Sequence, residues 1–387
     1  MLIANKIELR PTPEQATYLN QSCGARRHCY NQLLAHFSQP GVKWSKAAAY
    51  QYYMAVLRVE FPWYSDVSSR VTRNAIDDLD RAYQHFFRRV KAKAKHAGYP
   101  QFKKKDVNDS FAMREPSKFS VDIKELRIER LKTKIEMRQP LRFTGPAKQA
   151  TISKQAGKFF VSVLLETDDY NPHAPTEPSV GVDFGITSLA VLSTGEVIPA
   201  NNALKRNIKH LQRRQRNLSR KVKGSRRRAK AKLKVAKLHD RISNQRRAVL
   251  HELSDQLTRT YQVITIEDLN VSGMVGNRRL ARSISDAGFG ELRRQIEYKA
   301  AWRGVTVVIA DRFFPSSKMC HACGQVHDLP LAQRTMECDC GSVMDRDLNA
   351  AKNLDRYGLD RLDALKPDVK RTQEPGKTVS AALALTA

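Results

Sequence analysis

Residues 345–354 read Asp-Arg-Asp-Leu-Asn-Ala-Ala-Lys-Asn-Leu, and the other informative parts of the chain are best interpreted in relation to this segment. It predicts the start of a helix that carries two acids, followed by two alanines small enough to let the helix approach a sheet closely. Either acid can be a helix cap or an N-terminal charge that the helix dipole stabilises. We expect Asp345 to be the cap and Asp347 to bind a metal, but the pattern alone also allows the reverse.

Two further acids interrupt or end apolar, β-type runs far upstream. Asp183 lies in Val-Gly-Val-Asp-Phe-Gly-Ile (180–186), and Glu267 lies in Val-Ile-Thr-Ile-Glu-Asp-Leu (263–269). Each acid alone could be a turn or strand-end residue. Burial of a carboxylate costs on the order of several kcal/mol unless it is paired or metal-bound. We therefore predict a nuclease centre in which Asp183 bridges two Mg²⁺ ions, while Glu267 and Asp347 each complete one ion.

Four of the six cysteines form two short pairs just before residue 345, and each pair is followed at once by a glycine. The spacing is Cys-x2-Cys and then Cys-x-Cys, which is typical of metal-binding turns rather than disulfides. Four thiolates close a tetrahedral site, so we predict one structural Zn²⁺ with no catalytic role. His321 or His327 could replace one cysteine. The expected zinc ligands are Cys320, Cys323, Cys338 and Cys340.

The charge is large and unevenly distributed. The 387 residues have a net charge of +29, and residues 204–250 carry 19 Lys and Arg against one acid. Such an excess indicates a nucleic-acid partner, and a chain with no long apolar run predicts no membrane partner. We expect a soluble, cytoplasmic protein that is associated with the nucleoid when bound to DNA. The candidate nucleic-acid-binding residues are Lys103, Lys104, Lys105, Lys205, Arg206, Lys209, Arg213, Arg214, Arg216, Arg220, Arg226, Arg227 and Arg228.

Local patterns predict secondary structure along most of the chain. Thr12, Pro13 and Gln15 form the start of a helix with a capping box, and a second helix over 67–95 follows a possible cap at Asp66. Near-helical spacing places Cys23 and Cys29 in the core. A basic helical hairpin is expected over 204–250. The other predictions are strands over 1–10, 141–143, 150–153, 159–165, 180–186, 188–193, 196–199, 262–267 and 305–310, a turn over 155–157, a loop after Glu267 and a helix over 289–303.

The length and the order of these elements predict an α+β protein with several domains. Residues 1–12 and 105–170 should form a small β-barrel, with a helical domain over 13–104 inserted. A Pro-rich linker follows, and then a nuclease domain of the RNase-H-like type over 178–318 and 342–358, interrupted by the hairpin. We expect a zinc ribbon over 319–341 and a disordered tail over 359–387.

Several motifs together resemble the TnpB family, the transposon-encoded RNA-guided DNA nucleases related to type V CRISPR effectors. They are Gly-Val-Asp-Phe-Gly (181–185), Ile-Glu-Asp-Leu-Asn-Val (266–271), Phe-Pro-Ser-Ser-Lys-Met-Cys (314–320), the zinc ribbon, and residues 345–351. Segments 10–15 and 98–103 are similar but less specific. The chain departs from the family pattern in its Cys-x-Cys pair and in Met336, where an aromatic residue is common.

The resemblance implies a wedge-like barrel with a helical recognition insert and a RuvC-like nuclease domain. It also implies a guide RNA from the transposon end and a double-stranded DNA target beside a short transposon-adjacent motif. We expect a monomer with one RNA, although the sequence leaves the oligomeric state open. Asp183, Glu267 and Asp347 match the family's catalytic acids. The competing hypotheses are an unguided RNase-H-fold transposase or resolvase, and a non-catalytic zinc-ribbon regulator of transposition.

Overall fold

A computed structural model describes residues 1–168, 174–330 and 333–365. The chain divides into two compact units, Met1–Tyr170 with Lys209–Arg241, and Asn171–Ile208 with Ile242–Ala387. The first boundary coincides with the start of the predicted Pro-rich linker. Among the described residues, no helix is long and apolar enough to span a bilayer.

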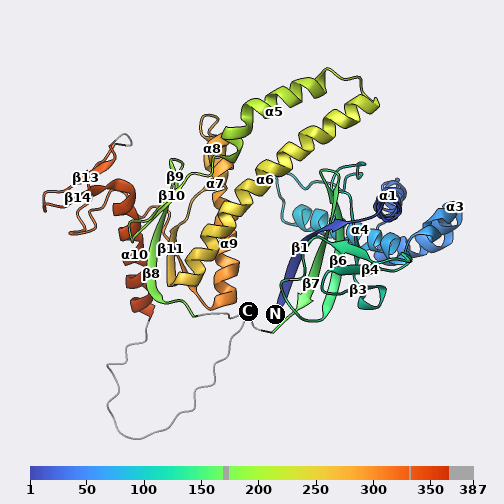
Figure 1. Cartoon of the computed structure of the whole chain (residues 1–387), viewed down its shortest axis with the longest axis horizontal. Helices are drawn as coiled ribbons and strands as arrows, with labels where there is room; N and C mark the ends of the chain where they lie inside the picture. Colours follow the sequence, from blue (N-terminus) through green and yellow to red (C-terminus); the bar gives the residue numbers. More distant parts are fainter. Residues whose placement is uncertain (169–173, 331–332, 366–387) are drawn as a thin grey trace, which may run out of the picture. The chain divides into compact units, whose positions relative to one another are not determined.

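The first unit is built on a nearly closed antiparallel sheet of seven strands (Figure 1). Buried and exposed side chains alternate along the long strands, so one face forms the core. The predicted turn joins β6 to β7, with Ala156 and Gly157 at positive φ. The strand predicted over 141–143 is wrong. The order is β2 (Ser110–Met113), β6 (Ala147–Gln155), β7 (Lys158–Glu166), β1 (Leu2–Arg10), β5 (Ile135–Met137), β4 (Glu125–Ile128) and β3 (Phe119–Val121).

Helices between β1 and β2 form a second core in this unit. Thr12 and Gln15 make the predicted capping box at α1, and burial raises the pKa of Cys23 to about 12, as expected for a core thiol. The cap of α4 is Ser68, whose hydroxyl accepts from a backbone N–H, so the prediction of Asp66 is wrong. These elements are α1 (Pro13–Phe37), α2 (Lys46–Tyr52), a π-helix (Tyr53–Leu57), α3 (Arg58–Glu60), a 3₁₀ turn (Pro62–Asp66) and α4 (Ser69–Lys91). A further 3₁₀ turn (Pro116–Lys118) follows β2.

The predicted basic hairpin is confirmed as α5 (Ala203–Ser219) and α6 (Arg226–Thr260), although α6 continues ten residues past the expected end. Its distal part, Lys209–Arg241, groups with the first unit. The amide of Gln155, at the end of β6, donates to Asp240 at 2.6 Å, and Gly157 faces Leu233. In the sequence, the hairpin thus interrupts the second unit, but its tip packs with the first unit.

The second unit contains a five-stranded sheet in the order β10-β9-β8-β11-β12. The first three strands are antiparallel, and β11 runs parallel to both β8 and β12. These strands and α9 (Phe289–Arg303) agree closely with the predicted ranges. The strands are β8 (Glu177–Phe184), β9 (Ser188–Leu192), β10 (Val197–Pro199), β11 (Tyr261–Glu267) and β12 (Thr306–Ala310).

Two predictions in this unit are wrong. The segment after β11 is not only a loop, because it contains the short helices α7 (Val271–Gly276), capped by Asn270, and α8 (Ala281–Ala287). Helix α10 spans Arg346–Leu365, so the tail predicted to be disordered from 359 is helical up to Leu365. The remainder of that predicted tail lies outside the described residues. A two-stranded ribbon, β13 (Thr335–Glu337) and β14 (Val343–Asp345), precedes α10.

Candidate metal centre and nucleic-acid interface

Asp183 and Glu267 lie on adjacent parallel strands at the same edge of the sheet. Val182 pairs with Ile266 in the register of β8 and β11. Asp183 and Glu267 are the next residues of these two strands. Val182 and Ile266 are both buried in the core. Since successive side chains alternate between faces, Asp183 and Glu267 share the opposite face of the sheet.

Helix α10 packs onto this same face, beside β8 in Figure 1. A Cβ on Gly181 would overlap the carbonyl oxygen of Ala351, and a Cβ on Gly358 would overlap the hydroxyl of Thr265. Gly181 and Thr265 are two residues before the strand acids, and therefore on their face. Asp347 lies one helical turn before Ala351, so it is directed toward the strand acids. The sequence interpretation foresaw the alanines but not the two glycines.

The electrostatics of Asp183 reflect this convergence. Burial, and then the nearby charges of Glu267 and Asp347, raise the pKa of Asp183 to about 8. Nearby negative charges disfavour ionisation of the Asp183 carboxyl group, and a bound divalent cation would offset this repulsion. Among the described residues, the four cysteines are the only group of at least three possible metal ligands whose ligand atoms all lie within 4.8 Å of one another. The three carboxylates are therefore spaced more widely than the cysteines.

The two acids at the start of α10 have different contacts. The Oδ1 atom of Asp345 accepts the backbone N–H of Asp347 at 2.9 Å and that of Leu348 at 3.1 Å, which is the geometry of a helix cap. The carboxylate of Asp347 lies in the first helical turn, with Arg334 at 3.8 Å. Asp345 therefore caps the helix, and Asp347 is the acid that remains available to bind a metal.

Ser316 is a residue near the acids to which the sequence interpretation assigned no role. Its hydroxyl donates to Oε1 of Glu267 at 2.6 Å, and its carbonyl oxygen accepts from Asn353 of α10 at 2.7 Å. It therefore connects β11 to α10 and orients Glu267. The neighbouring acid Asp268 is instead paired with Arg293 at 2.7 Å and with Arg312, and these hydrogen bonds lower its pKa.

The four predicted zinc cysteines come together, with all their sulfur atoms within 4.8 Å of one another. Gly324 and Gly341 have φ values of 81° and 88°, and each donates its backbone N–H back across a tight turn. This left-handed conformation favours glycine. Nε2 of His327 lies 3.2 Å from Sγ of Cys338, but neither His327 nor His321 belongs to the group of clustered ligands. The set fits a tetrahedral metal site built from four thiolates.

Buried asparagines of α10 hold this cysteine cluster against the helix. The amide of Asn349 donates to the carbonyl oxygen of Met319 at 2.7 Å and accepts the N–H of His321 at 3.0 Å. Asn353 donates to the same carbonyl at 2.6 Å. The segment before the first zinc cysteine is thus fixed to the helix that carries Asp347. These are the asparagines of the segment 345–354, whose role the sequence pattern did not reveal.

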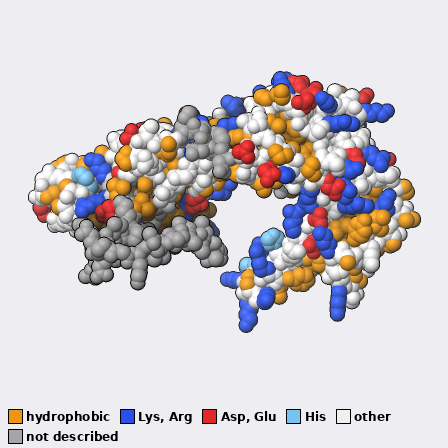
Figure 2. All heavy atoms as spheres, turned by 90° about the horizontal axis from the view of Figure 1, so that it is seen from below, with side chains coloured by type: hydrophobic (Ala, Val, Ile, Leu, Met, Phe, Trp, Pro, Cys, Tyr) orange, Lys and Arg blue, Asp and Glu red, His pale blue; other side chains and the backbone are white. Residues whose placement is uncertain are grey.

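Most of the predicted nucleic-acid-binding residues of the hairpin are exposed. Figure 2 shows Lys and Arg side chains over much of the visible face, interleaved with apolar ones. Arg228 differs, because its guanidinium donates to the carbonyl oxygens of Leu218 and Lys221 and so closes the end of α5. The exposed hairpin residues are Lys205, Arg206, Lys209, Arg213, Arg216, Arg220, Arg226 and Arg227.

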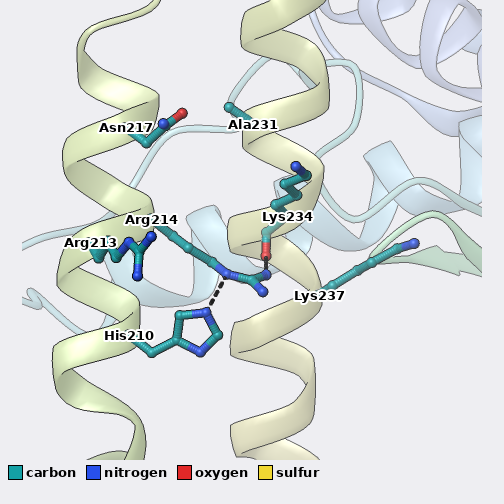
Figure 3. Close-up of a pocket in the computed structure, with 7 residues that line it drawn as sticks. All are labelled: His210, Arg213, Arg214, Asn217, Ala231, Lys234 and Lys237. Atoms are coloured by element: carbon teal, nitrogen blue, oxygen red, sulfur yellow. Dashed lines mark hydrogen bonds between the residues drawn. The ribbon is translucent and has the colours of Figure 1, made fainter.

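Basic side chains from both hairpin helices surround a groove, shown in Figure 3. Arg214 crosses between the helices, donating to Nε2 of His210 at 2.9 Å and to the carbonyl oxygen of Lys234 at 2.7 Å. Arg213 and Lys237 also line the groove. None of the lining residues is acidic, so the groove is suited to an anion such as a phosphodiester.

The basic run after α4 has two kinds of residue. Lys104 and Lys105 are exposed, whereas Lys103 is half-buried with its ammonium 4.0 Å from the ring of Tyr30 and 3.6 Å from Asp78. Burial lowers the pKa of Lys103 to about 8. Lys103 therefore makes internal contacts, and only its two neighbours project freely.

Comparison with known families identifies the chain's relatives. The OrfB_IS605 family, described as "Probable transposase", matches residues 161–278, and the Cas12f1-like TNB domain matches residues 289–354. A "Helix-turn-helix domain" of the same OrfB_IS605 group matches residues 1–39, where this structure has one strand and one long helix. The TNB match covers the cysteine cluster and the start of α10.

Two curated proteins are similar over nearly the whole chain. A Streptomyces pristinaespiralis protein named "Putative RNA-guided DNA endonuclease" is 39% identical, covering 92% of this chain and 89% of that one. The Escherichia coli K12 protein "Putative RNA-guided DNA endonuclease InsQ" is 34% identical and covers 91% of each. The chain thus belongs to the OrfB_IS605 (TnpB) family.

A solved structure titled "Cryo-EM structure of CasPhi-2 (Cas12j) bound to crRNA" matches with a TM-score of 0.42 and 11% identity, covering 93% of this chain and 98% of that one. A likeness at this level carries no argument about function.

Proposed function

We propose that the protein is an RNA-guided DNA endonuclease that cuts guide-matched double-stranded DNA with one RuvC-like centre. The observation that carries the proposal is the shared face of Asp183 and Glu267, onto which α10 packs with Asp347. The sheet supports a nuclease of the RNase-H-like type, since it starts with three antiparallel strands and has an acid in the first. Membership of the TnpB family supports RNA guidance.

In this proposal, Asp183, Glu267 and Asp347 would hold two Mg²⁺ ions, which would activate a water and stabilise the leaving oxygen. We give Asp183 the central position because the charges of both Glu267 and Asp347 contribute to raising its pKa. Ser316 orients the Glu267 carboxylate by its hydrogen bond. Asp345 fixes the first turn of α10, and so the position of Asp347.

The cysteine cluster would hold one Zn²⁺ with a structural role. Four protein ligands leave no open position for a substrate or water. Because Asn349 and Asn353 attach residues 319–321 to α10, folding of this zinc ribbon would help to position Asp347. The ribbon is therefore proposed as a support for the nuclease centre.

We assign nucleic-acid binding to the first unit and to the hairpin. The first unit corresponds to the proposed wedge-like barrel with its helical recognition insert, and the exposed cations of the hairpin would bind the phosphates of the guide RNA and the paired target. Such contacts carry no sequence information, so base pairing with the guide would select the target.

An unguided transposase of the same fold is the second candidate, because the matching family model is described as "Probable transposase". It would use the same acids but would recognise DNA directly. The two functions differ in their need for RNA.

The test is plasmid cleavage by protein purified with its own RNA, whose sequence defines the matched target. We expect Mg²⁺-dependent cutting of the matched plasmid, no cutting of a mismatched one, and loss of cutting after RNase treatment of the complex. Retention of activity after RNase treatment would instead support the unguided enzyme. Cleavage by Asp183→Ala at the wild-type rate would refute both.

A further inference from the structure

A cavity of about 420 Å³ lies in the second unit, beside the end of the strand that carries Asp183. One wall is the turn 185–187 between β8 and β9, and the others are residues 200–202 before α5 and one side of α8. Gly185 is two residues beyond Asp183, and consecutive Cα atoms are ~3.8 Å apart, so this wall starts within about 8 Å of the Asp183 backbone. The cavity therefore lies beside the end of the strand that carries Asp183.

Asn201 lines the cavity and has an unsatisfied polar atom. The residue is only 4% exposed, and its Oδ1 atom has no hydrogen-bond partner among the described residues. Its Nδ2 atom donates to the carbonyl oxygen of Arg246 at 3.2 Å, which fixes the side chain. A buried acceptor without a donor is destabilising, so a bound molecule or a water that supplies the missing donor would stabilise this site.

The charge of the cavity is positive. Lys205 and Arg282 line it, are exposed, and have no ion-pair partner in the described part of the chain. The only acid in the lining, Asp286, is already neutralised, because it pairs with Arg246 at 3.0 Å and accepts two backbone N–H groups at the start of α5. The two cations are therefore available to an anion.

Thr187, Asn202 and Ser283 add polar groups to the lining, and its apolar part comes from Ile186, Leu189, Ala200 and Ala287. Such a surface suits the flat face of a nucleobase, while an amide oxygen accepts from an exocyclic amino group and cations bind the phosphate. The three kinds of group in the lining therefore suit the face of a base, the edge of the same base and the phosphate of one nucleotide.

We propose that this cavity binds one nucleotide of the DNA strand being cut, with its base against the apolar wall and Asn201, and its phosphate on Lys205 and Arg282. The site rests on the proposed nuclease function and adds to it a specific contact that positions the strand next to the metal centre. Lys205 and Arg282 act by holding the substrate, and Asn201 gives a preference for a base that carries an amino group.

The first test measures binding without cleavage. RNA-loaded Asp183→Asn protein in Mg²⁺-free buffer is titrated with a short, fluorescent single-stranded DNA that does not pair with the guide. Adding Lys205→Ala and Arg282→Ala should weaken binding about tenfold. The control pair Arg247→Ala and Arg278→Ala removes the same charge from the second unit outside the cavity and should change affinity much less. Equal losses in the two pairs would overturn the proposal.

The second test uses cleavage of guide-matched DNA in which abasic sites replace one nucleotide at a time near the cut. The wild type should be slowed about tenfold at one position, and Asn201→Ala should lose this dependence while still cutting. No sensitive position in the wild type would overturn the pocket. Absence of any cleavage would refute the proposed function, whereas the binding test would still decide whether the cavity holds a nucleotide.

Discussion

Gly181 lies directly beneath the backbone of Ala351, so close that a Cβ on the glycine would overlap the alanine's carbonyl oxygen. This contact sets how closely α10 approaches β8, and α10 carries Asp347. The absence of a side chain at position 181 is thus a condition for bringing a helix acid to the two strand acids.

Gly181→Ala should therefore move α10 away from the sheet. We expect a loss of about 1–3 kcal/mol in the free energy of unfolding, together with a strong loss of cleavage. The added Cβ would overlap the carbonyl oxygen of Ala351 and the backbone nitrogen of Asp355, and neither of these atoms can rotate away. Denaturant unfolding and a cleavage assay measure the two effects. Gly290→Ala is the matched control, since nothing lies within 4 Å of a Cβ there. If both variants behave like the wild type, the close approach is not required.

Asp345→Asn and Asp347→Asn should separate the two acids of α10. Asparagine caps helices about as well as aspartate, so Asp345→Asn should keep most of the activity. Asp347→Asn removes a metal-binding charge and should cost more than the ~10–100-fold that loss of an outer-shell partner typically costs. Single-turnover cleavage at fixed Mg²⁺ measures both rates. The opposite order of effects would assign the metal to Asp345.

The pKa of Asp183 predicts how stability depends on pH without metal. Its folded value of about 8 lies above the ordinary value of 3.8, so the folded state holds this proton more tightly than the unfolded chain. Stability should fall as pH rises from about 4 to 8, by at most ~1.4 kcal/mol per pH unit. Thermal unfolding in Mg²⁺-free buffer should show a weaker dependence of stability on pH for Asp183→Asn. Equal slopes for the variant and the wild type would mean that the carboxylate is not strained by its neighbours.

Removal of zinc should unfold the ribbon and reduce cleavage indirectly. We expect one zinc per chain by elemental analysis, and its loss in Cys320→Ser, because three thiolates cannot close the site. Cys23→Ser is the control, since Cys23 is a buried core thiol far along the chain, and it should keep its zinc. A full zinc content in Cys320→Ser would point to His327, which lies 3.2 Å from Cys338, as a replacement ligand.

Local sequence patterns predicted the elements that carry the acids, but not how those elements meet. Apolar runs placed Asp183 and Glu267 on strands, and the capping chemistry of Asp345 followed from its position before a helix. The contacts of Gly181 and Gly358 could not be predicted, because a glycine in a strand or helix gives no sign of which backbone lies opposite it. The short strands between 110 and 137 were missed for a similar reason, since three- or four-residue strands depend on their neighbours more than on their own pattern.

The roles of polar residues were the least predictable part of the site. Ser316 and Asn353 lie in motifs that were noticed, yet their hydrogen bonds join segments that are far apart in the sequence. Among the cations, Arg214, Arg228 and Lys103 looked like their exposed neighbours in the sequence. Only the structure shows that each makes internal contacts.

The most direct measurement is the anomalous diffraction of Mn²⁺ in crystals of the RNA-loaded protein, with Mn²⁺ replacing Mg²⁺. We predict Mn²⁺ peaks bonded to carboxylate oxygens of Asp183, Glu267 and Asp347 together, at the ~2.0–2.2 Å expected of such ligands. Mn²⁺ bound elsewhere, or to fewer than all three of these acids, would contradict the shared metal centre.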